Sequence, residues 1–449
     1  MNVGKRLVAR VIESAGLLAS LLLAAPFAGA MPRPHASLLS SEPAAGATLV
    51  ASPSRIRLVF SEPVEIAMSG ATVSNVNGSI ALAITGDPRD VHALVAGVPA
   101  LQPGVHTVRW HVVSADGHRV DGSFSFTIEG TGGTAGGAAS PNGAWSGAAA
   151  PAAGAAATAG AAAVQHAVSA DSGFVAALGR RPQVPILRAA AITILLALAG
   201  LTLLIATLPI SGARPMRLAV ILAVLSTALL ASYLAVWSST AVGATHSILD
   251  AVSLAASTTP GALEVARLAL AFLALWALWL AKRPGLAALF SGVAVLITGA
   301  SGHPAVTQPL VAIPAKSVHL AAAAIWLGGL LWIMTAERHG ARYVEGTRKI
   351  SSLAMISVII VVATGVLQGF LFLPRVAALT DSTYGRVILA KSAGLLVLVF
   401  FGAFHRRIVP RLDTTMARRR LRGSVRLEIV VMLAVSIAGG LLAAIAPPR

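Results

Sequence analysis

Asp116, Gly117 and His118 form the segment of this sequence best suited to binding a metal ion. Side chains two residues apart in an extended segment point the same way, and the glycine between them lets the chain fold both around an ion. An imidazole nitrogen with a carboxylate oxygen is a combination that Cu(II) prefers. Asp-Gly is also the strongest short signal for a hairpin turn, so these residues by themselves favour a turn over a metal site.

A second set of candidate residues lies in and beside apolar stretches of the C-terminal part, where ionisable groups are costly and therefore mark function. The candidates for a metal path there are His246, Glu264, His303, His319, Met334, Met355 and His405. His303 and His319 are the strongest ligands among them, while Met432 and Glu428 lie at a similar depth to His405. Methionine sulfur is a soft ligand, which makes Cu(I) a candidate for this path.

Three cations in the same region, Arg267, Lys316 and Lys391, would repel a copper ion. Pairing with Glu264 would remove part of that repulsion and leave the histidines free. Two alternatives stay open, because such a cluster could also tie helices together or bind an anion. Lys316, His319 and Trp326 are predicted to share one helix face.

The 449 residues contain no cysteine, which excludes disulfides, thiolate metal sites and thiol catalysis. They are 56% hydrophobic and only 11% charged, too apolar for a soluble globular protein. The net charge of +17 lies entirely in residues 171–449, since residues 1–34 carry +3 and residues 35–129 carry −3. A basic excess in the most apolar part argues against nucleic acid as a partner and for the cytoplasmic loops of a membrane protein.

Residues 1–30 are predicted to be a signal peptide. Lys5, Arg6 and Arg10 precede an apolar run at 15–25, and Ala-Gly-Ala at 28–30 supplies the small residues of a cleavage site. Cleavage there leaves Met31 as the first residue of the mature chain, and further trimming would leave His35.

Residues 35–129 are predicted to form an immunoglobulin-like β-sandwich, because roughly seven short alternating strands fit into them between prolines and glycines. The clearest strands are 55–60, 70–74, 105–113 and 122–128. His106 alternates with apolar residues and should face the core, while His92 and His111 read as surface or strand histidines.

Three blocks of this segment resemble the periplasmic copper-resistance protein C (CopC) family: His-Ala-Ser-Leu-Leu-Ser-Ser-Glu-Pro at 35–43, Leu-Val-Phe-Ser-Glu-Pro-Val at 58–64 and Trp-His-Val-Val-Ser-Ala-Asp-Gly-His at 110–118. The resemblance implies a Cu(II) site made by His35, Asp116 and His118, completed in that family by the terminal amine of the histidine. Met68 is the one methionine between residues 35 and 129, so a thioether Cu(I) site is not expected in this domain.

Residues 130–170 carry no charge, consist almost wholly of small residues and proline, and are predicted to be a flexible linker. Residues 180–449 are predicted to form an all-α polytopic membrane domain of about eight transmembrane helices. The expected spans are 186–209, 217–238, 263–281, 285–300, 314–335, 350–373, 386–404 and 425–446, of which the fourth is short.

The distribution of basic residues predicts the orientation of this domain. Loops 210–217, 282–284, 336–349 and 405–426 hold 16 Lys and Arg, whereas the opposite loops and the tail hold Lys316, Arg375, Arg386 and Arg449. Basic residues concentrate on the cytoplasmic side, so the chain is expected in a bacterial inner membrane with its N-terminal domain in the periplasm.

The membrane domain resembles the copper-resistance protein D (CopD) family from about residue 300 to the C-terminus. The resemblance is carried by His319, by Ile-Trp-Leu-Gly-Gly-Leu at 325–330, Thr-Gly-Val at 364–366, Asp-Ser-Thr-Tyr-Gly-Arg at 381–386, Ala-Lys-Ser at 390–392 and Glu428. Natural fusions of the two families have this order, and the family is associated with copper uptake or tolerance.

The leading functional hypothesis is therefore that the chain binds Cu(II) in the periplasm and passes copper toward the cytoplasm, with the copper ion, the lipid bilayer and other periplasmic copper carriers as partners. Two alternatives are a copper-tolerance or sensing factor that does not move copper, and a membrane redox protein that uses haem or copper. No nucleophile elbow, zinc-protease helix or carboxylate pair indicates an enzyme.

Overall fold

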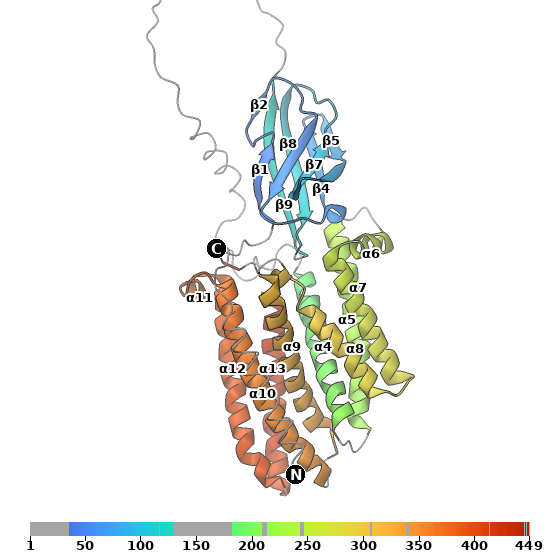
Figure 1. Ribbon diagram of the computed structural model, residues 1–449, viewed down its shortest axis with the longest axis vertical. Coiled ribbons are helices and arrows are strands. Elements are labelled where there is room, and N and C mark those ends of the chain that lie inside the picture. Colours follow the sequence, from blue (N-terminus) through green and yellow to red (C-terminus); the bar gives the residue numbers. More distant parts are fainter. Residues whose placement is uncertain are drawn as a thin grey trace, which may run out of the picture. The chain divides into compact units, whose positions relative to one another are not determined.

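The computed structural model describes residues 36–115, 117–129, 182–208, 213–242, 247–305, 308–337, 341–412, 414–443, 445 and 447–448. The expected signal peptide and linker, and the candidate ligands His35, Asp116 and His246, lie outside these residues. The described chain consists of a β unit up to residue 129 and a helical unit from residue 182 (Figure 1).

The β unit is a sandwich of two sheets. One sheet has the strand order β1 (Leu38–Glu42), β3 (Arg55–Phe60), β7 (Asp90–Gly97), β6 (Ile84–Asp87). The other has the order β2 (Thr48–Leu49), β9 (Arg119–Ile128), β8 (Gly104–Val113), β4 (Gly70–Asn75), β5 (Gly78–Leu82). The sandwich prediction is confirmed, with nine strands in the described residues rather than about seven because β2 and β6 are too short to be recognised by alternation.

The core between the sheets comes from the alternating residues of the longer strands. Ile56, Leu58 and Phe60 of β3 are all at most 1% exposed, and the Phe60 ring meets that of Trp110 edge-on with centroids 5.1 Å apart. Gly122 on β9 lies beneath the Trp110 ring, where any side chain would collide with it. This packing fixes the β8–β9 hairpin, which holds Gly117 and His118 at its turn.

His106 on β8 is a core residue, as predicted. Its ring is 1% exposed and stacks on Phe126 at 5.6 Å, and its Nε2 lies 2.7 Å from the carbonyl oxygen of Gln102. It is therefore a satisfied structural histidine and does not belong to a metal site.

The described residues of the helical unit contain seven helices that are long and apolar enough to cross a membrane. They are α4 (Gln183–Thr207), α5 (Arg214–Val242), α7 (Thr259–Trp279), α9 (Pro309–Thr335), α10 (Ala341–Phe372), α12 (Thr383–Ile408) and α13 (Thr415–Leu442). The remaining elements are α6 (Ile248–Ala256), α8 (Pro284–Thr298), α11 (Ala378–Asp381) and the short 3₁₀ turns η2 (His303–Ala305) and η3 (Val409–Arg411).

Helix α8 corresponds to the fourth expected span and is the short one, as predicted. Its 15 residues extend over only about 22 Å at 1.5 Å per residue, against about 30 Å of bilayer hydrocarbon. The eight expected apolar runs are thus eight helices, of which seven have the length of a full crossing.

Helix α4 packs against α5, α8, α9 and α13 and is the most enclosed of the long helices. Its closest neighbour is α9, because Gly200 and Gly328 meet backbone to backbone. A side chain at Gly328 would collide with the backbone of Gly200, and one at Gly200 with the carbonyl oxygen of Ala324. Gly200 and Gly328 therefore permit the close packing of α4 against α9.

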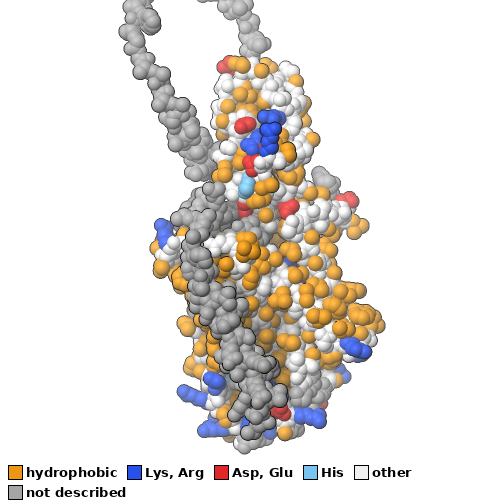
Figure 2. Space-filling view, in the orientation of Figure 1, with side chains coloured by type: hydrophobic (Ala, Val, Ile, Leu, Met, Phe, Trp, Pro, Cys, Tyr) orange, Lys and Arg blue, Asp and Glu red, His pale blue; other side chains and the backbone are white. Residues whose placement is uncertain are grey.

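Two of the expected loops are largely helical. Helix α10 begins at Ala341 rather than near 350, and the expected loop 405–426 contains the end of α12, the turn η3 and the first three turns of α13. Apolar runs mark the part of a helix that lies in hydrocarbon, whereas Arg and Lys favour helix and extend it beyond that part. Figure 2 shows these Lys and Arg side chains gathered toward the end of the helical unit where α10 and α13 begin.

Candidate metal site and intramembrane polar clusters

Ser114, Ala115, Gly117 and His118 lie in a tight turn between β8 and β9. The Gly117 amide donates to the carbonyl oxygen of Ser114 at 2.8 Å, and the Ser114 amide donates to that of His118 at 2.9 Å. Gly117 has a φ of +87°, a conformation that favours glycine. The turn indicated by the Asp-Gly pair is present, and it leaves His118 half-buried at its end.

Residues 61–65 connect this turn to the start of β1. The amide of Ser37 donates to Ser61 Oγ at 2.9 Å, and that of Ser61 donates to the carbonyl oxygen of Ser37 at 2.9 Å. On the other side, the amide of Ala115 donates to the carbonyl oxygen of Pro63 at 3.2 Å. Ser37, two residues from His35, and Ala115, next to Asp116, are therefore held by the same short segment.

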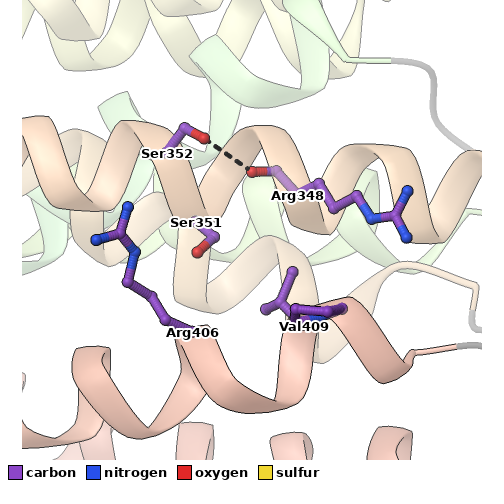
Figure 3. Close-up of a pocket in the computed structure, with 6 residues that line it drawn as sticks. Arg348, Ser351, Ser352, Arg406 and Val409 are labelled. Carbon is purple, nitrogen blue, oxygen red and sulfur yellow. Dashed lines mark hydrogen bonds between the residues drawn. The ribbon is translucent and has the colours of Figure 1, made fainter.

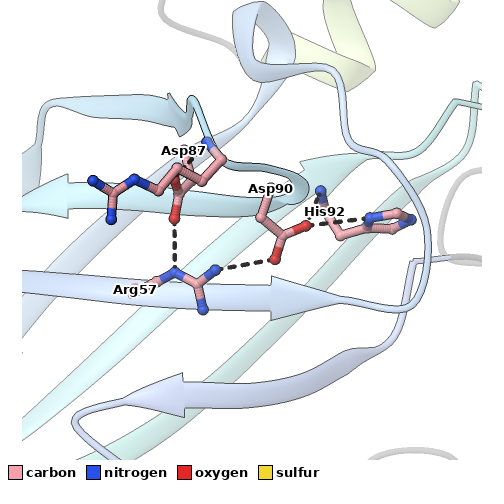
Figure 4. Close-up of polar contacts among 5 residues, drawn as sticks. Arg57, Asp87, Asp90 and His92 are labelled. Carbon is pink, nitrogen blue, oxygen red and sulfur yellow. Dashed lines mark hydrogen bonds and ion pairs between the residues drawn. The ribbon is translucent and has the colours of Figure 1, made fainter.

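His92, a partly exposed histidine of the β unit, belongs to an ion-pair cluster (Figure 4). Arg57 lies between Asp87 and Asp90, with Nε–Oδ2 and Nη2–Oδ2 distances of 2.9 and 3.0 Å, and His92 Nδ1 is 3.3 Å from Asp90. Backbone amide donors and the Arg57 guanidinium lower the pKa of both carboxyls. Because the arginine occupies both carboxylates, this cluster is not a metal site.

His111 on β8 is half-buried against Gly70. Burial and the nearby Arg119 lower the pKa of His111, so its ring is neutral at physiological pH. Within the described residues, no group of three or more His, Asp and Glu side chains is arranged to hold a metal ion.

In the helical unit, Glu264 pairs with Arg267 on the same helix, α7. Arg267 Nη1 donates to Glu264 Oε2 at 2.6 Å, and the two residues are 0% and 4% exposed. This is the pairing expected for a carboxylate among cations. It engages Glu264 with Arg267 rather than leaving the carboxylate for a metal.

Three cations converge on Ser301, between α8 and η2. Arg188 and Arg267 donate through Nη2 to the Ser301 hydroxyl at 3.1 and 3.4 Å, and Lys316 Nζ donates to its carbonyl oxygen at 2.6 Å. Neither Arg188 nor Ser301 was expected from the sequence. Arg188 is the third residue of the first apolar run, and an ionisable residue inside such a run could have marked it as a candidate.

His303 and His319 lie in different surroundings. His303 is 6% exposed and its ring lies near those of Phe372 and Tyr384, with centroids 6.4 and 6.5 Å away. His319 Nδ1 lies 2.9 Å from Thr364 Oγ1, and that hydroxyl donates to the carbonyl oxygen of Ile360 at 2.6 Å. These contacts fit the His319 tautomer that donates through Nδ1 and has its lone pair on Nε2, the nitrogen that would bind a metal.

The residues expected to share one face of α9 contact three different neighbours. Lys316 bonds to Ser301, His319 to Thr364 on α10, and Trp326 Nε1 to Glu428 Oε1 on α13 at 3.0 Å. A single shared cluster on this face is therefore not what the structure shows. Helix α9 is surrounded by other helices, so residues at slightly different angles around its axis contact different neighbouring helices.

The remaining candidates lie nearer the other end of the bundle. His405 lies between Ser424, at 2.7 Å from Nε2, and Glu428, at 3.1 Å from Nδ1. Met432 is 4% exposed, Met334 is partly buried and its carbonyl oxygen accepts from Arg422 at 2.8 Å, and Met355 is half-buried on α10.

An open pocket of about 320 Å³ lies between α10 and the end of α12 (Figure 3). It is lined by Arg348, Ser351, Ser352, Arg406, Val409 and Pro410. This lining is cationic and contains no histidine, methionine or carboxylate. It is therefore not a copper site.

Comparisons with known proteins identify both halves of the chain. The CopC domain model matches residues 38–129, and the model of copper resistance protein D matches residues 345–442. Protein YobA of Escherichia coli K12 is 39% identical over 98 residues, which are 21% of this chain and 79% of that protein.

The similarity to one relative extends over both units. The copper transport protein CutJ of Bacillus subtilis 168 is 26% identical over 416 residues, which are 90% of this chain and 73% of that protein. Among solved structures, CopC from Methylosinus trichosporium OB3b is 28% identical, with a TM-score of 0.21, and the match covers 22% of this chain and 99% of that one. The fusion expected from the sequence motifs is confirmed by the two family matches together with this relative.

Proposed function

We propose that this chain, which belongs to the family of fused CopC–CopD copper-resistance proteins, captures copper with its β unit and carries it across the bacterial inner membrane with its helical unit. The proposal rests on one observation: a single chain contains both a β-sandwich of a copper-protein family and seven long apolar helices. A relative named as a copper transport protein aligns with 90% of the sequence, which supports transport over binding alone.

Capture takes place at His35, Asp116 and His118 in this proposal, with Cu(II) as the ion. It is supported by the segment 61–65, which bonds to the chain beside His35 and beside Asp116. The tight turn at Gly117 supports it as well, because a rigid turn reduces the ordering that metal binding requires.

Passage through the membrane begins at His303 and His319 and continues toward Met334, Met355 and His405. The lone pair left on His319 Nε2 supports a role as ligand. The pairing of Glu264 with Arg267 supports it too, since it reduces the positive potential that a copper ion would meet. The concentration of basic residues at one end of the bundle supports an orientation with the β unit in the periplasm, and in this proposal copper moves from that side toward the cytoplasm.

The test is copper uptake into proteoliposomes that contain the purified chain. Wild-type protein should accumulate copper above empty liposomes, the double variant His303→Ala/His319→Ala should lose most of that uptake, and His92→Ala should keep it. Absence of uptake by wild-type protein contradicts transport and leaves a tolerance or sensing role.

The haem alternative is less well supported. A haem held between two histidines needs both rings at one site, whereas His319 contacts Thr364 on α10 and His405 contacts Ser424 and Glu428 on α13. An optical spectrum of the purified protein checks this directly, because a Soret band would favour electron transfer.

A further inference from the structure

The open pocket between α10 and the end of α12 combines two arginines from different helices with two hydroxyls (Figure 3). Arg348, Ser351 and Ser352 come from α10, and Arg406 comes from α12. Figure 3 shows the Arg406 side chain extending toward α10 and the Ser351 hydroxyl directed into the space between the two helices. The Ser352 hydroxyl donates to the carbonyl oxygen of Arg348 at 3.3 Å. Two guanidinium groups with a hydroxyl donor are suited to an oxyanion such as phosphate.

Within the described part of the chain, no carboxylate occupies these arginines. Neither Arg348 nor Arg406 forms an ion pair with a described Asp or Glu. Glu345, one turn from Arg348 on α10, pairs instead with Lys349, whose Nζ lies 2.8 Å from Oε1. The Ser351 hydroxyl likewise forms no hydrogen bond with a described residue. Two cations and one hydroxyl are therefore available to an anion from outside the chain.

The two arginines lie at the level where apolar surface ends. Arg348 is two residues before the apolar run 350–373 of α10, and Arg406 is two residues after the run 386–404 of α12. Both are exposed, although the two helices pack against each other. Charged side chains at the ends of membrane helices extend to the interface, where lipid headgroups lie. Basic pockets between helices at this depth are a usual site for anionic headgroups.

The helix faces that carry the arginines continue as exposed apolar surface along the apolar runs. Ile359 and Val366 follow Arg348 by 11 and 18 residues, which places both within about 20° of it around α10. Both are more than half exposed. On α12, Val399 precedes Arg406 by seven residues, lies on the same face and is exposed. Each helix thus offers an acyl chain an apolar surface that ends at the pocket.

The size and charge of the pocket restrict what it can hold. Pockets that enclose a whole small molecule measure about 300–1,000 Å³, so a volume of about 320 Å³ fits a phosphate with its glycerol and leaves the acyl chains outside. The lining contains two cations and no carboxylate. It therefore repels the ammonium group of a zwitterionic headgroup and favours an anionic one.

We propose that this pocket binds the phosphodiester headgroup of one anionic glycerophospholipid, with Arg348 and Arg406 pairing with the phosphate and Ser351 donating a hydrogen bond to it. The inference goes beyond the proposed copper function and requires only that the helical unit lie in a bilayer. The headgroup joins the ends of α10 and α12, because it binds one cation from each. Of the seven long helices described, α12 is the least enclosed by its neighbours, so it gains most from such a contact.

Native mass spectrometry of the delipidated full chain in detergent measures this site, with phosphatidylglycerol and phosphatidylcholine as probes. Wild-type protein should bind one phosphatidylglycerol more tightly than phosphatidylcholine. Arg348→Gln/Arg406→Gln should lose about tenfold or more of the phosphatidylglycerol affinity, since one hydrogen bond to a charged group is usually worth about that factor. Equal binding of the two lipids by wild-type protein overturns the proposal.

A matched double variant controls for the overall basic charge of this end of the bundle. Arg342→Gln/Arg407→Gln removes two exposed arginines from the same two helices, and neither residue lines the pocket. Its phosphatidylglycerol affinity should stay within about twofold of wild type, because exposed charges outside a site contribute little. An equal loss in both double variants would mean that the lipid responds to net charge alone, and the site would be rejected.

Thermal unfolding in detergent separates lipid binding from support of the helix ends. Phosphatidylglycerol should raise the midpoint of wild-type protein and should raise that of Arg348→Gln/Arg406→Gln much less. Arg348→Lys/Arg406→Lys, which keeps both charges but loses the planar fork, should recover part of the effect. If the lipid stabilises the glutamine variant as much as wild type, the arginines act only within the protein and the proposal fails.

A soluble competitor identifies the source of the phosphate. Glycerol 3-phosphate carries the phosphate and glycerol but lacks the acyl chains that lie along α10 and α12. It should therefore displace phosphatidylglycerol only at a large excess. Displacement at equal concentration would make the pocket a site for soluble phosphates and would contradict a lipid occupant. None of these measurements involves copper, so their outcome is independent of whether the chain transports it.

Discussion

At the residue scale, His118 is the member of the proposed copper site that the structure describes. Its removal should abolish most of the Cu(II) affinity of the β unit, because two ligands cannot hold the ion in the tetragonal geometry that it prefers. Changes in residues that merely support metal ligands already cost about 10- to 100-fold in affinity, so the loss for His118→Ala should be at least that large.

Electron paramagnetic resonance of the full chain loaded with one equivalent of Cu(II) measures this loss. His92→Ala is the matched control, since it removes a partly exposed histidine held by Asp90 and should leave the spectrum unchanged. An unchanged spectrum in His118→Ala, or an equal loss in both variants, would contradict the proposed ligand set.

Residue types and spacing were sufficient to select His118, His319 and Glu264, but they did not reveal what each side chain contacts. His118 lies in the turn that Asp-Gly indicates. The convergence of Arg188, Arg267 and Lys316 on Ser301 depends on four segments far apart in sequence. Hydropathy identifies an ionisable residue within an apolar run, but it does not specify the neighbouring helix.

At the element scale, Arg57 on β3 ties this strand to the hairpin of β6 and β7. Asp87 and Asp90 have lowered pKa values, so their ion pairs contribute stability above the ordinary carboxyl pKa of 3.8, and that contribution is lost as pH falls through their folded values. Arg57→Gln should therefore weaken the hairpin at neutral pH and make little difference in strong acid.

Hydrogen exchange of residues 84–97 in the full chain, corrected for the intrinsic effect of pH, measures the difference. The gap in protection between Arg57→Gln and wild type should narrow steadily on acidification. A gap that is constant with pH would mean that Arg57 acts through its aliphatic stem rather than through its charge.

The contact of α4 with α9 has no room for a side chain. Gly328→Ala should destabilise the helical unit by about 1–3 kcal/mol or more, the usual cost of overpacking, because the obstacle is backbone that cannot turn away. Gly369→Ala on α10 is the control, since nothing lies within 4 Å of the added carbon there.

Thermal unfolding of both variants in one detergent compares them. A lower midpoint for Gly328→Ala together with an unchanged or higher one for Gly369→Ala is expected. Equal midpoints would mean that the helices separate at this point at little cost.

Some kinds of helix and strand could be predicted from the sequence better than others. Apolar run length was enough to predict the helices and the short α8, and alternation was enough for β3 and β8. The helical starts of α10 and α13 were missed because they are rich in Arg and Lys, and α6 was missed because its 9 residues are too few for a span.

At the scale of the whole molecule, the absence of cysteine makes the orientation of the chain easy to test. Glu337, at the end of α9, and Val376, after α10, are both exposed and lie at opposite ends of α10. If the basic end of the bundle is cytoplasmic, a membrane-impermeant maleimide should label Val376→Cys in intact spheroplasts and label Glu337→Cys only after lysis.

The parent chain is its own blank in this experiment, since it has no thiol. The reverse labelling pattern would place the basic residues outside and would contradict movement of copper toward the cytoplasm.

The meeting of Gly200 and Gly328 has a consequence for how the helical unit assembles. Two glycines in contact order no side chain, so α4 and α9 associate without losing rotamer entropy. Lipid tails provide no hydrophobic drive to bring helices together, and close backbone approach with its dispersion attraction takes the place of that drive. We therefore expect α4 and α9 to pair early in membrane folding. The longer, more loosely packed helices would then pack against this rigid pair.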